Sequence, residues 1–66
     1  MTEPLLQFFE FGHLTPHMAE VSRHFSHLAE HLVATLPRNP ERTMALRKLL
    51  EAKDCAVRAV LYRGDT

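Results

Sequence analysis

The sequence predicts an all-α protein in which a short N-terminal helix or arm packs on an antiparallel two-helix hairpin, and the hairpin assembles into an oligomer. Two long segments, residues 15–36 and 40–62, carry apolar residues at helical spacing, and each starts at a capping residue followed by proline. The connection between them is short and contains two prolines, as in αα-hairpins. At 66 residues, the chain has the length of one small domain, a single helical hairpin over residues 1–66.

The N-terminal arm, residues 1–14, holds three of the four phenylalanines of the chain. So much apolar surface is unfavourable in water, and we therefore expect the arm to dock on the hairpin. The run is too brief for periodicity to choose between a short helix and an ordered arm, and Gly12 marks its end.

Residues 15–36 are predicted to form the first long helix. Thr15 suits the N-cap position, Pro16 suits the first helical position, and Pro37 cannot continue the helix. A row of apolar side chains at spacings of three and four is expected to face the second helix. The row consists of Met18, Val21, Phe25, Leu28, Leu32 and Leu36.

Residues 40–62 are predicted to form the second long helix. Asn39 can cap its free amide groups, Pro40 fits the first helical position, and Glu41 complements the positive end of the helix dipole. No glycine or proline interrupts the segment, in which helix-forming residues dominate.

An apolar arc covers more than half of the circumference of this second helix. One partner helix covers a narrower stripe, so we expect burial on two sides, by the hairpin and by a neighbouring subunit. The arc consists of Ala45, Leu46, Leu49, Leu50, Ala52, Ala56, Val57, Ala59, Val60 and Leu61. Lys53 projects into the arc, where it either lays its aliphatic stem along the surface or is aimed at a ligand between subunits, and the first is expected. Cys55, the single cysteine, is expected to be a buried structural thiol.

Charge and hydropathy narrow the classes of partner. Eight Lys and Arg residues balance eight Asp and Glu residues, so the chain lacks the basic field with which proteins bind long nucleic acid. No apolar run is long enough to span a bilayer, and the N-terminus lacks the basic start of a signal peptide. We expect a soluble, cytoplasmic protein without membrane or long nucleic-acid partners. Cations cluster around the loop at Arg38, Arg42, Arg47 and Lys48, where symmetry can gather them around a small anion.

The histidines and glycines bear on whether the chain binds a metal or catalyses a reaction. His24, His27 and His31 stand at helical spacing, with His17 beside them, but one helix usually offers only two zinc ligands and no compact Cys/His set accompanies them. We therefore expect no metal and no cofactor. With two glycines in all, the chain has no Gly-rich phosphate loop and no nucleophile elbow, so we do not expect an enzyme.

Two segments of the chain carry a recognisable pattern. The first is Phe9-Glu10-Phe11-Gly12-His13-Leu14-Thr15-Pro16, an aromatic-x-aromatic run that ends in proline. The second follows Pro37 and reads Glu41-Arg42-Thr43-x-Ala45-Leu46-Arg47-Lys48-Leu49-x-Glu51-Ala52. Together they resemble a known family, the small phage-encoded anti-CBASS sponges, which share a helical hairpin domain with anti-Thoeris proteins, and the resemblance covers most of residues 9–61.

The resemblance implies a hexamer that sequesters cyclic di- or trinucleotide messengers without cleaving them and so blocks CBASS signalling in an infected bacterial cell. It implies that Phe11 stacks on a base, in place of the tyrosine common in the family. Arg42 and Thr43 match an Arg-Ser/Thr pair associated with a pocket for cyclic trinucleotides, and Arg38 is a cation close to them. Arg23 and His17 are candidates for the phosphate contact that a lysine makes in some relatives, because the shorter segment before Pro37 gives that lysine no aligned position.

A second class of function is a non-enzymatic module for protein interaction or regulation. In that interpretation the wide apolar arc binds a protein partner and the cations near the loop are solvated. Retained solubility as a closed homo-oligomer would count against this interpretation, because the apolar surface would then already be occupied.

Overall fold

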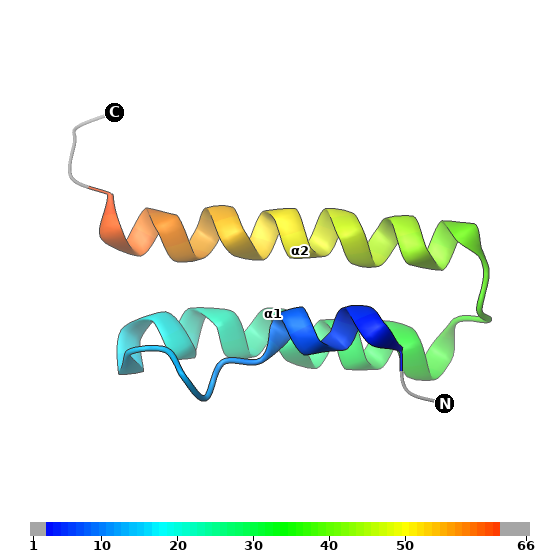
Figure 1. The fold of residues 1–66 in the computed structure, drawn as a ribbon, viewed down its shortest axis with the longest axis horizontal. Coiled ribbons are helices and arrows are strands. Elements are labelled where there is room, and N and C mark those ends of the chain that lie inside the picture. Colours follow the sequence, from blue (N-terminus) through cyan, green and yellow to red (C-terminus); the bar gives the residue numbers. More distant parts are fainter. Residues whose placement is uncertain (1–2, 63–66) are drawn as a thin grey trace.

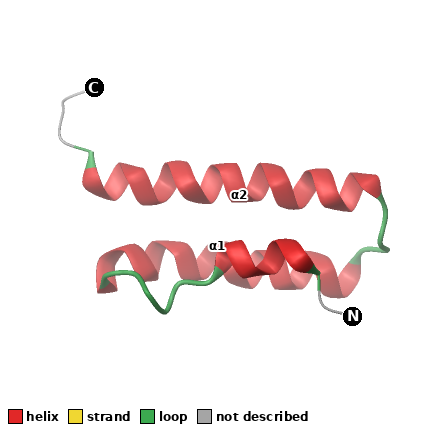
Figure 2. Ribbon diagram, viewed as in Figure 1, coloured by secondary structure: helices red, strands yellow, loops and turns green. Residues whose placement is uncertain are grey.

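Three helical elements follow one another in the computed structural model, which describes residues 3–62. They are the 3-10 helix η1 (Pro4–Phe9), the helix α1 (Pro16–Thr35) and the helix α2 (Pro40–Leu61). α1 and α2 run antiparallel and η1 lies along α1 (Figure 1). The described chain contains helices and loops and no strand (Figure 2). The predicted hairpin is thus confirmed, and the arm is a short helix.

The ends of the elements follow from their capping residues. Glu3 caps η1, where its carboxylate accepts a hydrogen bond from the backbone N–H of Leu5 at 3.4 Å. Asn39 caps α2, where its Oδ1 accepts a bond from the N–H of Arg42 at 2.8 Å. Thr15 occupies the N-cap position of α1, but its side chain accepts no capping bond.

Within residues 3–62, neither long helix has an apolar stretch of the length and hydropathy that a bilayer span requires.

Replacing Asn39 with alanine is expected to lower the free energy of unfolding by about 1 kcal/mol, because one amide at the start of α2 loses its partner. Thr15→Ala is the matched control, since the Thr15 side chain makes no capping bond, and its effect is expected to be smaller. Urea unfolding followed by circular dichroism measures both. A loss as large in Thr15→Ala as in Asn39→Ala would show that the capping bond is not the cause.

The fully buried apolar core of the described chain contains one residue from each element. Phe9 of η1 is 1% exposed, and Ala29 of α1 and Leu46 of α2 are 0% exposed. Partly buried apolar residues surround these three, namely Leu5, Leu6, Phe25, Leu32, Val33, Leu49 and Leu50. The docking of the arm, expected from its apolar content, is therefore confirmed. The arm contributes Phe9, one of the three fully buried apolar residues of the described chain.

The side of α1 that is buried differs from the predicted row of large apolar residues. The buried residues of α1 are Ser22, Ser26 and Ala29, whereas Leu28 and Leu36 are exposed. Both η1 and α2 pack on α1, and small side chains on the shared side let their backbones approach closely. The prediction that the whole row faces α2 was therefore wrong for Leu28 and Leu36.

Cys55 is exposed, so the prediction of a buried thiol was also wrong. On a helix, Cys55 lies on the side of α2 roughly opposite to Leu46, which is the side that packs in the core. Ala52 and Ala59, two members of the predicted apolar arc, are exposed too. A single hairpin therefore covers only part of the arc.

Candidate functional site

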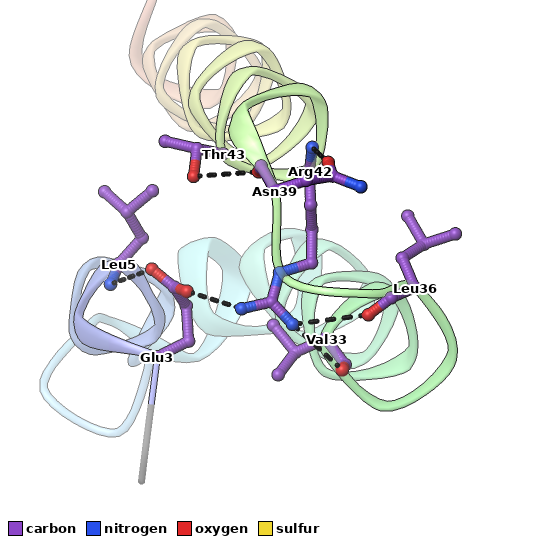
Figure 3. Close-up of polar contacts among 7 residues, drawn as sticks. All are labelled: Glu3, Leu5, Val33, Leu36, Asn39, Arg42 and Thr43. Atoms are coloured by element: carbon purple, nitrogen blue, oxygen red, sulfur yellow. Dashed lines mark hydrogen bonds and ion pairs between the residues drawn. The ribbon is translucent and has the colours of Figure 1, made fainter.

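Arg42 joins all three elements (Figure 3). Its Nη2 donates to Oε2 of Glu3 at 2.9 Å, and its Nη1 donates to the carbonyl oxygens of Val33 and Leu36, each at 3.4 Å. The side chains of Glu3 and Arg42 are both only 8% exposed. Because the two carbonyls belong to the last turn of α1, the guanidinium also satisfies acceptors that a helix end leaves without a partner. Arg42 is thus the internal link between arm, first helix and second helix.

The other sequence-predicted residues of this end of the hairpin are closer to solvent. Arg38 is exposed in the connection between α1 and α2. The hydroxyl of Thr43, which is half-buried, donates to the backbone oxygen of Asn39 at 3.4 Å. We call Arg38, Arg42 and Thr43 the loop half-site. It combines one solvent-exposed guanidinium, one hydroxyl and one guanidinium that already has a carboxylate partner.

Phe11 lies on α1. Its ring contacts the ring of His27 edge to face, with 6.5 Å between centroids and 79° between planes. Arg23 stands one turn before His27 on the same side of α1, since residues four apart are neighbours on a helix. We call Phe11, Arg23 and His27 the arm half-site. It consists of a half-buried aromatic ring packed against His27 and an arginine one helical turn before His27.

Arg23 has a partner on the surface. Its Nη2 lies 2.7 Å from Oε1 of Glu20, and both side chains are substantially exposed. The hydrogen bond from Arg23, reinforced by its charge, lowers the pKa of the Glu20 carboxyl. Exposed ion pairs contribute little free energy, so an incoming phosphate can replace Glu20 as the partner of Arg23. His17 is exposed on another side of α1 and does not join this half-site.

The two half-sites lie apart along the hairpin. The loop half-site is at the α1–α2 connection, and the segment of residues 10–15 that carries Phe11 lies toward the other end of the long axis (Figure 1). One subunit therefore does not bring Phe11 together with Arg38, Arg42 and Thr43.

Lys53 provides a second anchor for the arm. Its Nζ donates to the carbonyl oxygen of Phe8 at 2.7 Å and lies 3.3 Å from Oδ1 of Asp54. The same ammonium group is 5.9 Å from the ring centroid of Phe9, a cation–π distance. The stem of Lys53 is buried, as predicted, but its charged end binds η1 instead of extending into water.

The sequence analysis missed two residues that contact predicted site residues: Glu3, which binds Arg42, and His27, which packs against Phe11. Glu3 is 39 positions from Arg42, and nothing local marks it as more than a helix cap. His27 was grouped with the other histidines of α1, and its spacing of four from Arg23 was the available signal. Among residues 3–62, no three His, Cys, Asp or Glu side chains are placed to hold a metal ion. No family model, curated protein or solved structure matches this chain.

Proposed function

We propose that this protein binds cyclic di- or trinucleotide messengers, does not cleave them, and assembles into a homo-oligomer to do so. The observation that carries the proposal is the composition of the two half-sites. An aromatic ring, guanidinium groups and a hydroxyl are the groups with which proteins stack on bases and bind phosphates. Of the half-site residues, Phe11, Arg42 and Thr43 fall within the two segments that resemble the anti-CBASS sponges, for which sequestration of the messenger blocks host signalling.

Arg38 is the phosphate ligand best placed for this role at the loop half-site. It is exposed, whereas Arg42 is paired with Glu3, and a phosphate that reaches Arg42 has to displace that carboxylate. Thr43 can redirect its hydroxyl, because its bond to Asn39 is long at 3.4 Å. In this arrangement Arg38 and Thr43 contact the ligand. Arg42 holds the loop half-site in place through its bonds to Glu3 and to the carbonyl oxygens of Val33 and Leu36.

At the arm half-site, Phe11 offers a base-stacking surface and Arg23 offers the neighbouring charge. The contribution of stacking on an aromatic side chain is about 1–3 kcal/mol per base. The two half-sites are separated within a subunit, so in this proposal assembly brings the loop half-site of one subunit close to the arm half-site of another. This is the physical reason to couple ligand binding to self-association, and the resemblance gives six subunits as the expected number.

Replacing Arg38 with alanine is expected to weaken binding of the messenger about tenfold to a hundredfold. A hydrogen bond to a charged group contributes roughly 1.5–3 kcal/mol, and 1.4 kcal/mol corresponds to a factor of ten. Isothermal titration calorimetry with a panel of cyclic di- and trinucleotides measures the change. Arg58→Ala is the control, because Arg58 is an exposed arginine near the other end of α2.

Equal affinities for Arg38→Ala and the wild type would remove Arg38 from the site. A wild-type protein that binds no member of the panel would contradict the proposed function as a whole.

The alternative, a protein-interaction module, has its own supporting observation. Met44, Leu61 and Tyr62 of α2 are 50%, 61% and 73% exposed, respectively. Apolar side chains this accessible suit contact with another protein. Nucleotide binding distinguishes the two functions, because a protein-interaction module binds no cyclic nucleotide.

A further inference from the structure

A hollow between η1 and α1 is lined by acidic and uncharged residues. It has a volume of about 440 Å³, which is within the range of small-molecule pockets. Its polar lining consists of Glu3, Gln7 and Glu10 from the arm and of Ser26 and Glu30 from α1. Among the residues that the structure describes, no lysine, arginine or histidine lines it. Because all charges in the lining have one sign, the electrostatic field of the hollow favours a cation.

Two of the three carboxylates in this hollow have no counter-ion. Glu3 is paired with Arg42, but within residues 3–62 neither Glu10 nor Glu30 forms an ion pair. Glu10 also borders a second hollow on the α2 side of η1, where the ammonium group of Lys53 is bonded to other partners. The first hollow thus presents two free carboxylates, one on the arm and one on α1.

The hydroxyl of Ser26 is a third polar group without a partner in this hollow. Ser26 is 8% exposed, and its side chain is part of the lining. Thr35 of the same helix donates its hydroxyl to the carbonyl oxygen of His31, one turn earlier, but the Ser26 hydroxyl forms no hydrogen bond with any described residue. Because a buried hydroxyl without a partner is unfavourable, this group is poised to bind a ligand in the hollow.

We infer that the hollow binds an aliphatic diamine or polyamine, a function separate from the proposed nucleotide binding. Two ammonium groups match the free carboxylates of Glu10 and Glu30, and the methylene chain between them packs on the apolar wall that Leu6 provides. The hydroxyl of Ser26 accepts a hydrogen bond from one ammonium group. A metal ion is a poorer match, since no three His, Cys, Asp or Glu side chains of residues 3–62 are placed to hold one.

A bound diamine joins the arm to the hairpin. Glu10 follows η1 directly and Glu30 belongs to α1, so a ligand that contacts both binds only while the arm is docked. A ligand that binds one state stabilises that state by mass action. The ligand is therefore expected to slow hydrogen exchange of the η1 amides.

NMR titration of the full chain with putrescine at low ionic strength is the experiment. The amide resonances of Gln7, Glu10, Ser26 and Glu30 are expected to shift and to saturate together. n-Butylamine has the same four-carbon chain with one ammonium group, like a lysine side chain, and is expected to bind about fivefold more weakly, the loss for one exposed ion pair.

Two variants locate the site. Glu30→Gln removes one carboxylate and is expected to weaken putrescine binding about fivefold. Ser26→Ala removes the hydroxyl and is expected to weaken binding as well, while alanine favours the helix. Glu41→Gln is the matched control, because Glu41 is an exposed glutamate of α2 outside the hollow, and its affinity for putrescine is expected to equal that of the wild type.

A wild-type titration without saturable shifts at the hollow would overturn the inference. Equal affinities for putrescine and n-butylamine would overturn the match to a diamine, and equal weakening in Glu30→Gln and Glu41→Gln would show a diffuse attraction by net charge instead of a site. None of these variants changes a residue of the two half-sites, so each of these results would leave the proposed nucleotide binding standing.

Discussion

Replacing Arg42 with methionine is expected to lower the free energy of unfolding by about 3–5 kcal/mol, because the substitution leaves the Glu3 carboxylate buried without its counter-ion. It also removes the donors to the carbonyl oxygens of Val33 and Leu36 at the end of α1. Methionine keeps most of the aliphatic volume, so the loss reports the charge and its hydrogen bonds. Urea unfolding measured by circular dichroism gives the value.

Arg47→Met is the control, since Arg47 is an exposed arginine in the same helix, and its effect is expected to be within about 0.5 kcal/mol. The double variant Glu3→Leu, Arg42→Met is expected to recover much of the loss, because apolar replacement of both members of a buried pair is often close to neutral. Equal stability of Arg42→Met and Arg47→Met would contradict the role of Arg42 as the link between the elements.

Replacing Phe9 with alanine is expected to lower the free energy of unfolding by about 3–5 kcal/mol and to release η1 from the hairpin. Phe9 is the only member of η1 in the fully buried core of the described chain, at 1% exposure. Phe8→Ala is the matched control, because Phe8 precedes it in the same helix and is 53% exposed. Hydrogen exchange of the η1 amides, together with urea unfolding, separates release of the arm from global unfolding.

Similar losses for the two phenylalanine variants would mean that the arm is held by backbone contacts, chief among them the bond from Lys53 to the Phe8 carbonyl. Faster exchange in η1 with unchanged global stability would place the arm outside the cooperative unit. Either result would contradict a core shared by η1, α1 and α2.

The hairpin could be predicted from the sequence because its signals are local. Thr15-Pro16 and Asn39-Pro40 mark two helix starts, and the observed α1 and α2 begin at these prolines. The docking of the arm followed from its apolar content alone. Its 3-10 geometry could not be predicted, because a six-residue helix has no measurable periodicity.

The packing face of α1 was misjudged for a physical reason. Periodicity picks out the largest apolar residues, but where three elements meet, the shared side needs small ones, here Ser22, Ser26 and Ala29. This arrangement leaves Leu28 and Leu36 exposed, at 45% and 40%.

The candidate site could be predicted as residues but not as geometry. The sequence indicates Arg42 as a cation near a helix start, but its pairing with Glu3 depends on the fold of the whole chain. The same holds for the separation of Phe11 from Arg38, since distance along the sequence says nothing about which end of a hairpin an arm reaches. In the proposed function, the separation of Phe11 from Arg38 is the reason for placing the pocket between subunits.

Native mass spectrometry of the purified protein, alone and with a panel of cyclic di- and trinucleotides, tests the proposed function most directly. The expected result is a homo-oligomer that takes up nucleotide and returns it with unchanged mass on denaturation. Recovery of a cleaved nucleotide would contradict sequestration. A stable oligomer that binds none of the panel would contradict nucleotide binding and would favour the protein-interaction module.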